Sequence, residues 1–575
     1  CRPEIVPPTP IALATIPAGL AEQAALNKPP TPIITPRIEG ESVTESNEAV
    51  AESGEAITEP VEVTASASSA GIWRLGVAPD VPVGLAQEVA AFAERHPDQF
   101  VWVGAEAADV VVGLGDERPF ATWYFAAAAP FATVADEVGL ADLQAAWQGS
   151  GQPLVVDAAT AAWLADKWGS ASAQVFFVSP EKRLETVWQK RPSWTIIPFD
   201  ELSPELKVLR LDGQSPIQDG FDAGGYGLQA NVSVAASTGS AGASTSSAGA
   251  STGSADAVSQ FLSTWDGPAS NRDADKLTSV AVTGVTALVR ATAYNMEQNG
   301  MLWPADDVGS VLQAADIAHI SNEVSFAPDC PYPNPIGGTT FCSGDNTFEL
   351  IKYIGTDVVE LTGNHLNDWG QEYLARSMAM YEAEGMATYG GGRNVAEAAE
   401  PALFEHNGNK IAFVGCNSFG PTYAWAGEAS AGAMPCDGSM AAQIRQLVAE
   451  GYLVIATLQG TEYYQYAATP DQQVQFKALA DAGATAVSGS QGHHAQAFDL
   501  YNGAFIHYGL GNLFFDQMDQ LGTRQTFVDR YIFYNGRLLS VDLWTGLIEN
   551  YAKPRLMTPQ EREAALTPLF QASGW

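Results

Sequence analysis

The sequence predicts an α/β fold class in two domains, and three observations support this prediction. In the first half of the chain, apolar runs such as IWRLGVAP, FVWVG and ADVVVGLG alternate with the amphipathic stretch GLAQEVAAFAERH. In the second half, TSVAVTGVTAL, ADIAHISNEVS, DVVELTG and YLVIATLQG alternate with stretches such as QEYLARSMAMYEAEG. Such alternation is typical of sheets covered by helices. Between the halves, a Ser-, Gly- and Ala-rich stretch has too few apolar side chains for a core and predicts a linker.

The length of 575 residues also exceeds that of one ordinary domain. We therefore divide the chain into a Pro- and Glu-rich tether over 1–70, a first α/β domain over 71–229, the linker over 230–260 and a second α/β domain over 261–575. Because Ser/Gly-rich linkers behave as flexible coils, we expect the two domains to move independently.

The charge balance excludes one class of partner. The formal net charge is −38, with 28 Lys and Arg residues against 66 Asp and Glu residues. Because a phosphate backbone is repelled by such a surface, we predict no nucleic-acid partner. An anionic surface is typical of an exposed, hydrated protein.

Residue 1 is a cysteine followed by a polar stretch, which is the pattern that lipoprotein maturation leaves. We expect a lipid on Cys1 that anchors the chain to a membrane on its extracytoplasmic side. An arbitrary starting point of the sequence is the alternative. No stretch approaches the ~20 continuous apolar residues of a membrane span.

The other four cysteines form two close pairs along the chain, Cys330 with Cys342 and Cys416 with Cys436. Two local disulfides fit an oxidising compartment. A zinc site built from all four thiolates is the alternative, but its CxxC-like spacing is missing. The spacing favours the disulfides.

Polar side chains follow several of the predicted strands of the second domain. They occur at Asn322-Glu323, at Gly363 to Asp368, at Gln459 to Tyr464 and at Ser488 to Gln496. Because functional groups of such sheets lie just past the carboxyl ends of strands, we expect these segments to meet at one rim. Among them, the cluster Tyr463, Tyr464 and Tyr466 could stack on a flat ligand or serve only in packing.

Four segments of the second domain carry a family resemblance. HISNEVSF, VELTGNHLNDWG, YGGGRNVAEAAEP and SGSQGHHAQAFDLYNGAFIHYGLGNLFFD, in this order, resemble the motifs of the CapA family of capsule (poly-γ-glutamate) biosynthesis proteins. The resemblance implies a fold similar to the calcineurin-like metallophosphoesterases, an α/β/β/α sandwich with a dinuclear metal site. In the first domain, ATWYFAAAAPFATVADEVGLADLQAAWQG and SWTIIPFDELSPELKVLRLDGQSPI resemble periplasmic solute-binding proteins.

By the CapA-like resemblance, Glu323, Asn364 and His493 are the expected metal ligands. His365 is the expected general acid, and Asp368 is expected to hold its tautomer.

The second domain also departs from the family pattern at three places. Val285 stands where a carboxylate is expected, and Leu458-Gln459 and Gln491 replace imidazoles. The remaining donors suffice for at most one divalent ion, although Glu462 and His494 lie near the lost positions.

Two functions from different classes remain open. The first is a cell-surface enzyme of the capsule-polymer type, which acts on an anionic polymer or its linkage through an incomplete metal site or acid–base groups alone. The second is a non-catalytic, lipid-tethered binding protein of the cell envelope. In both, the expected partner is an anionic polymer or another envelope component.

Overall fold

The computed structural model describes residues 72–218, 220–237, 250–490 and 492–575. The predicted tether 1–70 and the predicted lipid site at Cys1 lie outside these residues, as does Gln491. Both predicted disulfides are present, Cys330–Cys342 and Cys416–Cys436. They indicate an oxidising, extracytoplasmic compartment. In the described part of the chain, no helix has the length and apolar character needed to cross a bilayer.

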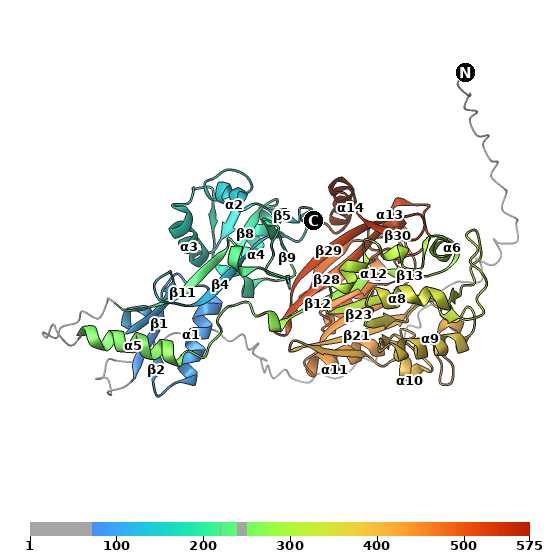
Figure 1. The fold of residues 1–575 in the computed structure, drawn as a ribbon, viewed down its shortest axis with the longest axis horizontal. Helices are drawn as coiled ribbons and strands as arrows, with labels where there is room; N and C mark the ends of the chain where they lie inside the picture. The colour runs from blue at the N-terminus through green and yellow to red at the C-terminus, as the bar shows by residue number, and fades with distance from the viewer. Residues whose placement is uncertain (1–71, 219, 238–249, 491) are drawn as a thin grey trace, which may run out of the picture. The chain divides into compact units, whose positions relative to one another are not determined.

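The first domain is built on one mixed sheet with helices on its faces (Figure 1). Strand β1 pairs in parallel with β2 and β3, and β11 then pairs antiparallel with both β3 and β4. Along the sheet the order is β2 (Phe100–Trp102), β1 (Trp73–Val77), β3 (Val110–Leu114), β11 (Gln229–Ala236), β4 (Pro119–Pro130), β8 (Trp194–Pro198), β6 (Leu154–Val156) and β7 (Phe176–Phe177), with β9 (Leu206–Val208) also on β4. The helices are α1 (Val83–Arg95), α2 (Leu140–Trp147), α3 (Ala158–Trp168) and α4 (Pro180–Gln189).

The ends of the predicted linker belong to this domain, which corrects its boundaries. Residues 230–236 lie in the central strand β11, where Val232 and Val234 are buried. Helix α5 (Ala250–Thr264) follows, and its Phe261 packs edge-on against Phe92 and Phe100, at ring-centroid distances of 5.2 and 6.2 Å. The apolar residues Ala257, Val258 and Phe261, at helical spacing, bind α5 to the core; composition alone hid this stripe.

The second domain contains two large sheets. The nine-stranded sheet has the order β18 (Ala387–Tyr389), β17 (Val358–Glu360), β14 (Ile317–Asn322), β12 (Leu277–Thr283), β28 (Gln525–Tyr534), β29 (Arg537–Glu549) and β30 (Lys553–Leu556), with β13 (Val285–Thr286) and β27 (Asn512–Phe514) off this path. The six-stranded sheet has the order β20 (Ala402–His406), β21 (Asn409–Asn417), β23 (Leu453–Gln459), β24 (Ala486–Gly489), β26 (Ala504–His507) and β25 (Phe498–Tyr501).

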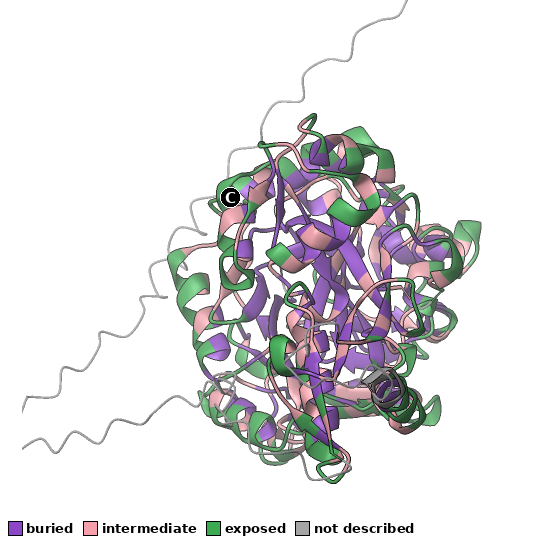
Figure 2. Cartoon of the chain, turned by 90° about the vertical axis from the view of Figure 1, so that its left-hand side faces the viewer, coloured by how far each residue is buried: buried purple, intermediate pink, exposed green. Residues whose placement is uncertain are grey.

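Alternation along the strands shows how these sheets are layered. In β17, Val358 enters the core shared by the two sheets, whereas Val359 packs with the helices outside. In β23, Ile455 likewise enters the shared core, and Val454 faces the opposite layer. Because successive side chains of a strand point to opposite faces, the domain is an α/β/β/α sandwich, as predicted. Figure 2 shows buried strands within and exposed helical faces outside.

Four helices cover the nine-stranded sheet and two cover the six-stranded sheet. The former are α6 (Arg290–Asn299), α7 (Gly309–Gln313), α8 (Phe348–Tyr353) and α9 (Gln371–Ala383). The latter are α11 (Ser439–Ala449) and α12 (Pro470–Asp481).

Residues of the two domains share two clusters of the core, contrary to the prediction of independent movement. Phe131 of the first domain packs edge-on against Phe498 and Phe505 at 5.6 and 5.1 Å. Arg562 donates to Asp136 at 2.7 Å, and Leu277 joins the first-domain cluster around Ala126. A coil-like linker allows two domains to separate but does not force them apart, so contacts between the domains decide whether they stay together.

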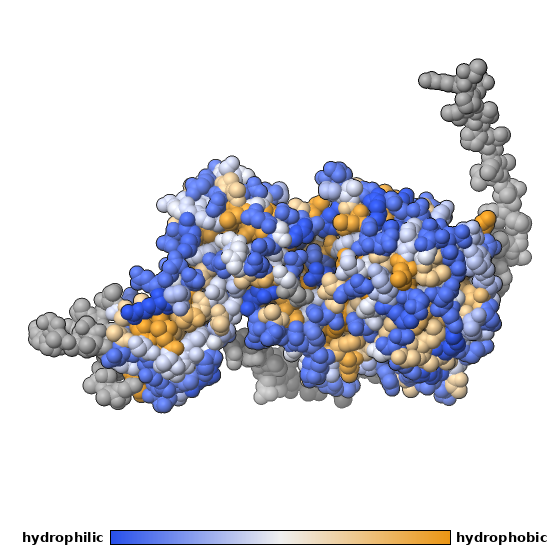
Figure 3. Space-filling model, in the orientation of Figure 1, coloured by the Kyte–Doolittle hydropathy of each residue, from blue (hydrophilic) through white to orange (hydrophobic). Residues whose placement is uncertain are grey.

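On the face drawn in Figure 3, hydrophilic residues predominate and hydrophobic ones form scattered patches.

Candidate functional site

The carboxyl ends of neighbouring strands place the predicted residues at one rim. Strands β13, β14 and β17 run parallel, with Val285 paired to Ser321 and Ser321 paired to Glu360. Glu323 follows β14, and the segment from Gly363 onward follows β17. These two loops touch, since an added Cβ on Gly363 would lie 2.7 Å from the Glu323 Cα. The close approach explains why glycine stands at 363.

His365 forms a tight pair with Asp368. The distance from His365 Nδ1 to Asp368 Oδ2 is 2.6 Å, and Asp368 also accepts from the Phe341 backbone N–H at 3.0 Å and from the Tyr423 hydroxyl at 3.2 Å. Because the carboxylate can only accept, Nδ1 carries a proton and Nε2 remains for chemistry. Burial lowers the pKa of His365, but the bond to Asp368 and the charge of Glu323 outweigh it, so this pKa is raised.

His493 forms a second pair, with Glu462, at 3.6 Å between Nε2 and Oε1. On the other side of the ring, Nδ1 lies 2.7 Å from Asn512 Oδ1. Since the Asn512 amide donates to the Thr523 carbonyl at 3.0 Å, its oxygen is the acceptor and His493 Nδ1 carries the proton. Burial lowers the pKa of His493, but its contacts with Glu462 and Glu323 outweigh it, so the pKa is raised.

The Arg290 guanidinium links the two pairs, because it lies 4.9 Å from the ring that packs on His365 and 4.9 Å from the ring that packs on His493. The charge of Glu323 acts on both imidazoles, and His493 lowers the pKa of His365. The carboxylate of each pair also accepts from a tyrosine hydroxyl. Tyr464 donates to Glu462 Oε2 at 2.7 Å, and Tyr423 donates to Asp368. The structure thus brings together His365, Asp368, Glu323 and His493, and it adds Glu462.

Phenyl rings pack against the two imidazoles, tilted on His365 and stacked on His493, and the sequence analysis missed them. Phe341 packs on His365 at 4.3 Å and Phe515 packs on His493 at 5.2 Å. The Arg290 guanidinium lies 4.9 Å from both phenyl rings and is held by Asp516. Only Phe515 and Asp516 had a sequence signal, since they end the GNLFFD segment.

Asn364 is tied to the opposite sheet. Its Oδ1 accepts from Gln459 Nε2 at 3.1 Å, and Gln459 Oε1 in turn accepts from Thr362 at 3.2 Å. Gln459 is buried, so the residue that stands near an expected imidazole has become part of a hydrogen-bond network between the sheets. His494, which lies near a lost position, bonds the Ala495 carbonyl at 2.7 Å, and its pKa is lowered by burial.

The donor set does not form a ready metal cage. Among the described residues, no three or more His, Cys, Asp or Glu side chains are grouped so as to hold an ion. Val285 and Leu458 are buried apolar residues, and Asn364 already shares its oxygen with Gln459. We therefore derive no step through a metal. Ligation of one divalent ion by Glu323, Asn364 and His493 stays a prediction.

The second domain is an α/β/β/α sandwich with paired imidazoles and carboxylates at its strand ends. The model of the family "Bacterial capsule synthesis protein PGA_cap" matches residues 279–517. The C-terminal part of the chain therefore belongs to the CapA/PGA_cap family. This is the segment that supplies Glu323, His365, Glu462 and His493.

Two curated relatives show the same match. The "Capsule biosynthesis protein CapA" of Bacillus anthracis is 26% identical over 274 residues, which cover 45% of this chain and 66% of the relative. The "PGA biosynthesis protein CapA" of Bacillus subtilis (strain 168) is 22% identical over 268 residues, which cover 45% of this chain and 70% of the relative. The chain thus spans about two thirds of each relative's length.

Solved structures are similar to different parts of this chain, and two of them come from Thermus thermophilus and Vibrio cholerae. The 5'-nucleotidase precursor from Thermus thermophilus is 11% identical with a TM-score of 0.29, and the similarity covers 51% of this chain and 58% of that one. An ABC-type phosphate transport receptor from Vibrio cholerae is 12% identical with a TM-score of 0.27, covering 33% of this chain and 93% of that one.

Proposed function

We propose that this chain is a cell-envelope enzyme of the capsule-polymer type, which acts at the linkage of an anionic surface polymer. The observation that supports the proposal is the presence of two imidazole–carboxylate pairs, His365–Asp368 and His493–Glu462, at one rim. Attachment through a lipid on Cys1, on the extracytoplasmic side, belongs to the same proposal.

The chemistry that the pairs support is general acid–base catalysis. His365 keeps Nε2 for substrate, because Asp368 binds Nδ1, and its raised pKa favours the protonated form that can donate to a leaving oxygen. The Glu462 carboxylate beside His493 accepts a proton from a water molecule whose oxygen bonds to the electrophilic atom of the linkage, and His365 protonates the oxygen whose bond to that atom breaks. Divalent metal bound by Glu323, Asn364 and His493 would supply Lewis-acid chemistry, but these steps do not require it.

The test is release of product from purified capsule polymer, with the full chain and chelator-treated buffer. We expect His365→Gln to lower turnover by about 100-fold, the lower range for loss of a general acid. Glu462→Gln should cause a similar loss. Glu450→Gln, at the exposed end of α11, is the matched control and should retain activity.

The binding-protein alternative is favoured by the buried apolar residues at Val285 and Leu458. It predicts that the unmodified chain binds polymer without turnover, and that His365→Gln leaves the affinity unchanged. Turnover that survives both substitutions would contradict the proposed roles.

A further inference from the structure

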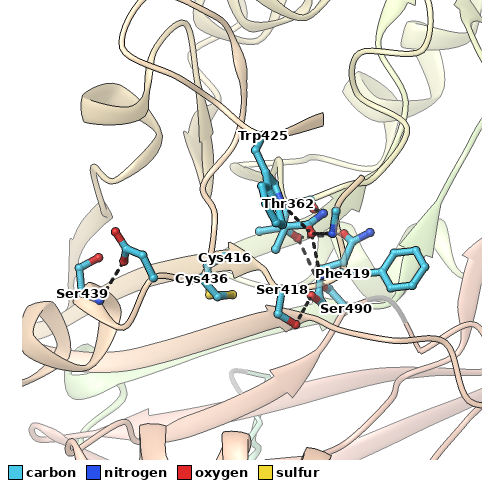
Figure 4. The surroundings of a disulfide bond; sticks show 12 residues. Thr362, Cys416, Ser418, Phe419, Trp425, Cys436, Ser439 and Ser490 are labelled. Carbon is cyan, nitrogen blue, oxygen red and sulfur yellow. Dashed lines mark hydrogen bonds between the residues drawn. A yellow bond between two sulfur atoms is a disulfide. The ribbon is translucent and has the colours of Figure 1, made fainter. Parts of the chain in front are cut away.

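A rigid loop beside the first pair displays aromatic side chains. The loop starts at Asn417, the last residue of β21, and the Cys416–Cys436 disulfide closes its base (Figure 4). Asn417 Oδ1 accepts from the Phe419 and Gly420 backbone N–H groups at 3.0 and 2.7 Å and from the Trp425 indole at 3.2 Å. One amide therefore fixes both sides of the loop.

The same side chain ties the loop to the catalytic rim. Asn417 Nδ2 donates to the Thr362 carbonyl at 2.8 Å, just before Gly363 and Asn364. Farther along the loop, the Ala431 carbonyl and the Tyr423 carbonyl both accept from Asn367, at 2.8 and 2.9 Å. The loop is thus built onto the segment that carries His365.

Despite this rigid support, its aromatic rings face solvent. Phe419 is 47% exposed and Tyr423 is 57% exposed. In Figure 4 the Phe419 ring points away from the disulfide. Across the site, Tyr464 is 44% exposed. Because burying an aromatic side chain stabilises a fold by about 1.5–3 kcal/mol, rings left exposed on ordered backbone beside the site point to a surface for a ligand.

Both exposed tyrosines, Tyr423 and Tyr464, form hydrogen bonds to carboxylates of the site. The Tyr423 hydroxyl bonds the carboxylate of the His365 pair, and the Tyr464 hydroxyl bonds the carboxylate of the His493 pair. Gln517 also donates to the Tyr464 hydroxyl at 3.3 Å, so this ring is held from two sides. A ligand stacked on either ring lies near the carboxylate of one imidazole pair.

The charges around the rings disfavour polyanions at this seat, because three carboxylates lie beside only two imidazoles. Glu323, Asp368 and Glu462 are carboxylates, and the nearby Arg290 is paired with Asp516. An anionic polymer chain or a phosphate is repelled here. A carboxylate can accept further hydrogen bonds, which sugar hydroxyls donate, while the C–H-rich face of a pyranose packs on an aromatic ring.

We propose that Tyr423, Tyr464 and Phe419 form a seat for a sugar ring of an uncharged envelope glycan. The proposal rests on the proposed function, since it names the sugar side of the linkage on which the site acts. The anionic polymer then extends away from the carboxylates.

Calorimetric titration of the full chain with an N-acetylglucosamine tetrasaccharide, and separately with poly-γ-glutamate, tests this seat. We expect the tetrasaccharide to bind and poly-γ-glutamate not to compete for it. Tyr423→Ala and Tyr464→Ala should each weaken binding by about three- to tenfold. Tyr423→Phe keeps the ring and should change affinity by less than about twofold.

Tyr353→Ala is the matched control, because this tyrosine is 46% exposed and lies at the end of α8. Absence of tetrasaccharide binding to the intact chain would overturn the inference, and so would equal loss in the control. Sugar binding by an unmodified chain that releases no product from capsule polymer would refute the proposed function and leave the sugar seat standing. Melting curves of each variant separate loss of binding from loss of fold.

Discussion

Histidine–carboxylate pairs of the second domain lie both at the rim and between the two sheets, and the pair of His365 with Asp368 differs in exposure from the pairs between the sheets. At the rim, the His365 side chain is 22% exposed and its partner Asp368 is 3% exposed. Between the two sheets, the side chains of His507 and Asp529 are both 0% exposed, at 2.8 Å from each other. The same chemical pair thus serves in a site and in a core, and position relative to the strand ends decides which.

The buried pairs join the sheets of the sandwich. His507 ends β26 of the six-stranded sheet, whereas Asp529 lies in β28 of the nine-stranded sheet. His319 similarly contacts Glu360 at 3.5 Å and the Tyr389 hydroxyl at 2.9 Å, and Tyr389 accepts from Thr457 of the opposite sheet at 3.1 Å. These groups stabilise one alignment of the sheets. The rim pairs instead lie in loops that follow strands.

The largest expected effect is on the buried pair. Asp529→Ala leaves His507 without its carboxylate inside the core, so we expect the free energy of unfolding to fall by about 3–5 kcal/mol. His365→Gln at the rim should lower it by less than about 1 kcal/mol. Urea unfolding of both variants measures the difference. Similar losses in the two variants would abolish the distinction between the regions.

The disulfide below the aromatic loop provides the next effect. Cys416 and Cys436 are separated by 20 positions, so in the chain-entropy model removing their bond with Cys416→Ala and Cys436→Ala costs about 3 kcal/mol. The same change at Cys330 and Cys342, separated by 12 positions, costs slightly less. Thermal unfolding of each pair of variants is the measurement. A loss of sugar binding only in the first pair would link that disulfide to the rim.

A buried cation at the domain junction extends the comparison to pH. Burial lowers the pKa of Lys207 to about 8, assisted by the charge of Arg562 and opposed by Asp136. Between pH 8 and 10.5 the unfolded chain holds a proton that the folded chain has released, so the free energy of unfolding rises with pH, by up to about 3 kcal/mol.

The measurement for Lys207 is urea unfolding of the intact chain and Lys207→Met across this window. The free energy of unfolding of the intact chain should rise with pH relative to that of Lys207→Met, by up to about 3 kcal/mol. Lys182→Met, at an exposed pair with Glu185, is the control and should follow the intact chain. A difference that is flat with pH would show that Lys207 stays charged in the fold.

Alternation of apolar and amphipathic runs predicted an α/β fold with polar residues at its strand ends, and the family resemblance implied the sandwich and the roles of these residues. His365, Asp368 and Glu323 follow strands whose parallel pairing can be inferred from the chain. Arg290 and Phe341 could not be predicted, because their role depends on ring stacking between segments distant in sequence. The prediction of a linker was wrong at both ends of 230–260 for another reason. Strand β11 pairs within a sheet and α5 packs by three apolar residues, and amino-acid composition reveals neither feature.

The smallest expected effect concerns restoration of a donor at the rim. Val285 is 2% exposed and pairs with Ser321 and Asn512, so Val285→Asp places a carboxylate beside the strand that precedes Glu323. We expect Mn²⁺ affinity, measured by calorimetry, to rise by less than about tenfold, since Leu458 still supplies no donor and Gln459 holds the Asn364 oxygen. Val285→Asn is the control, because it matches the shape without the charge. A rise of about 1,000-fold in Val285→Asp alone would mean that the retained residues already form most of a coordination shell. The rim would then be a metal centre lacking one ligand, and the distinction from the core pairs would rest on that ion rather than on acid–base chemistry.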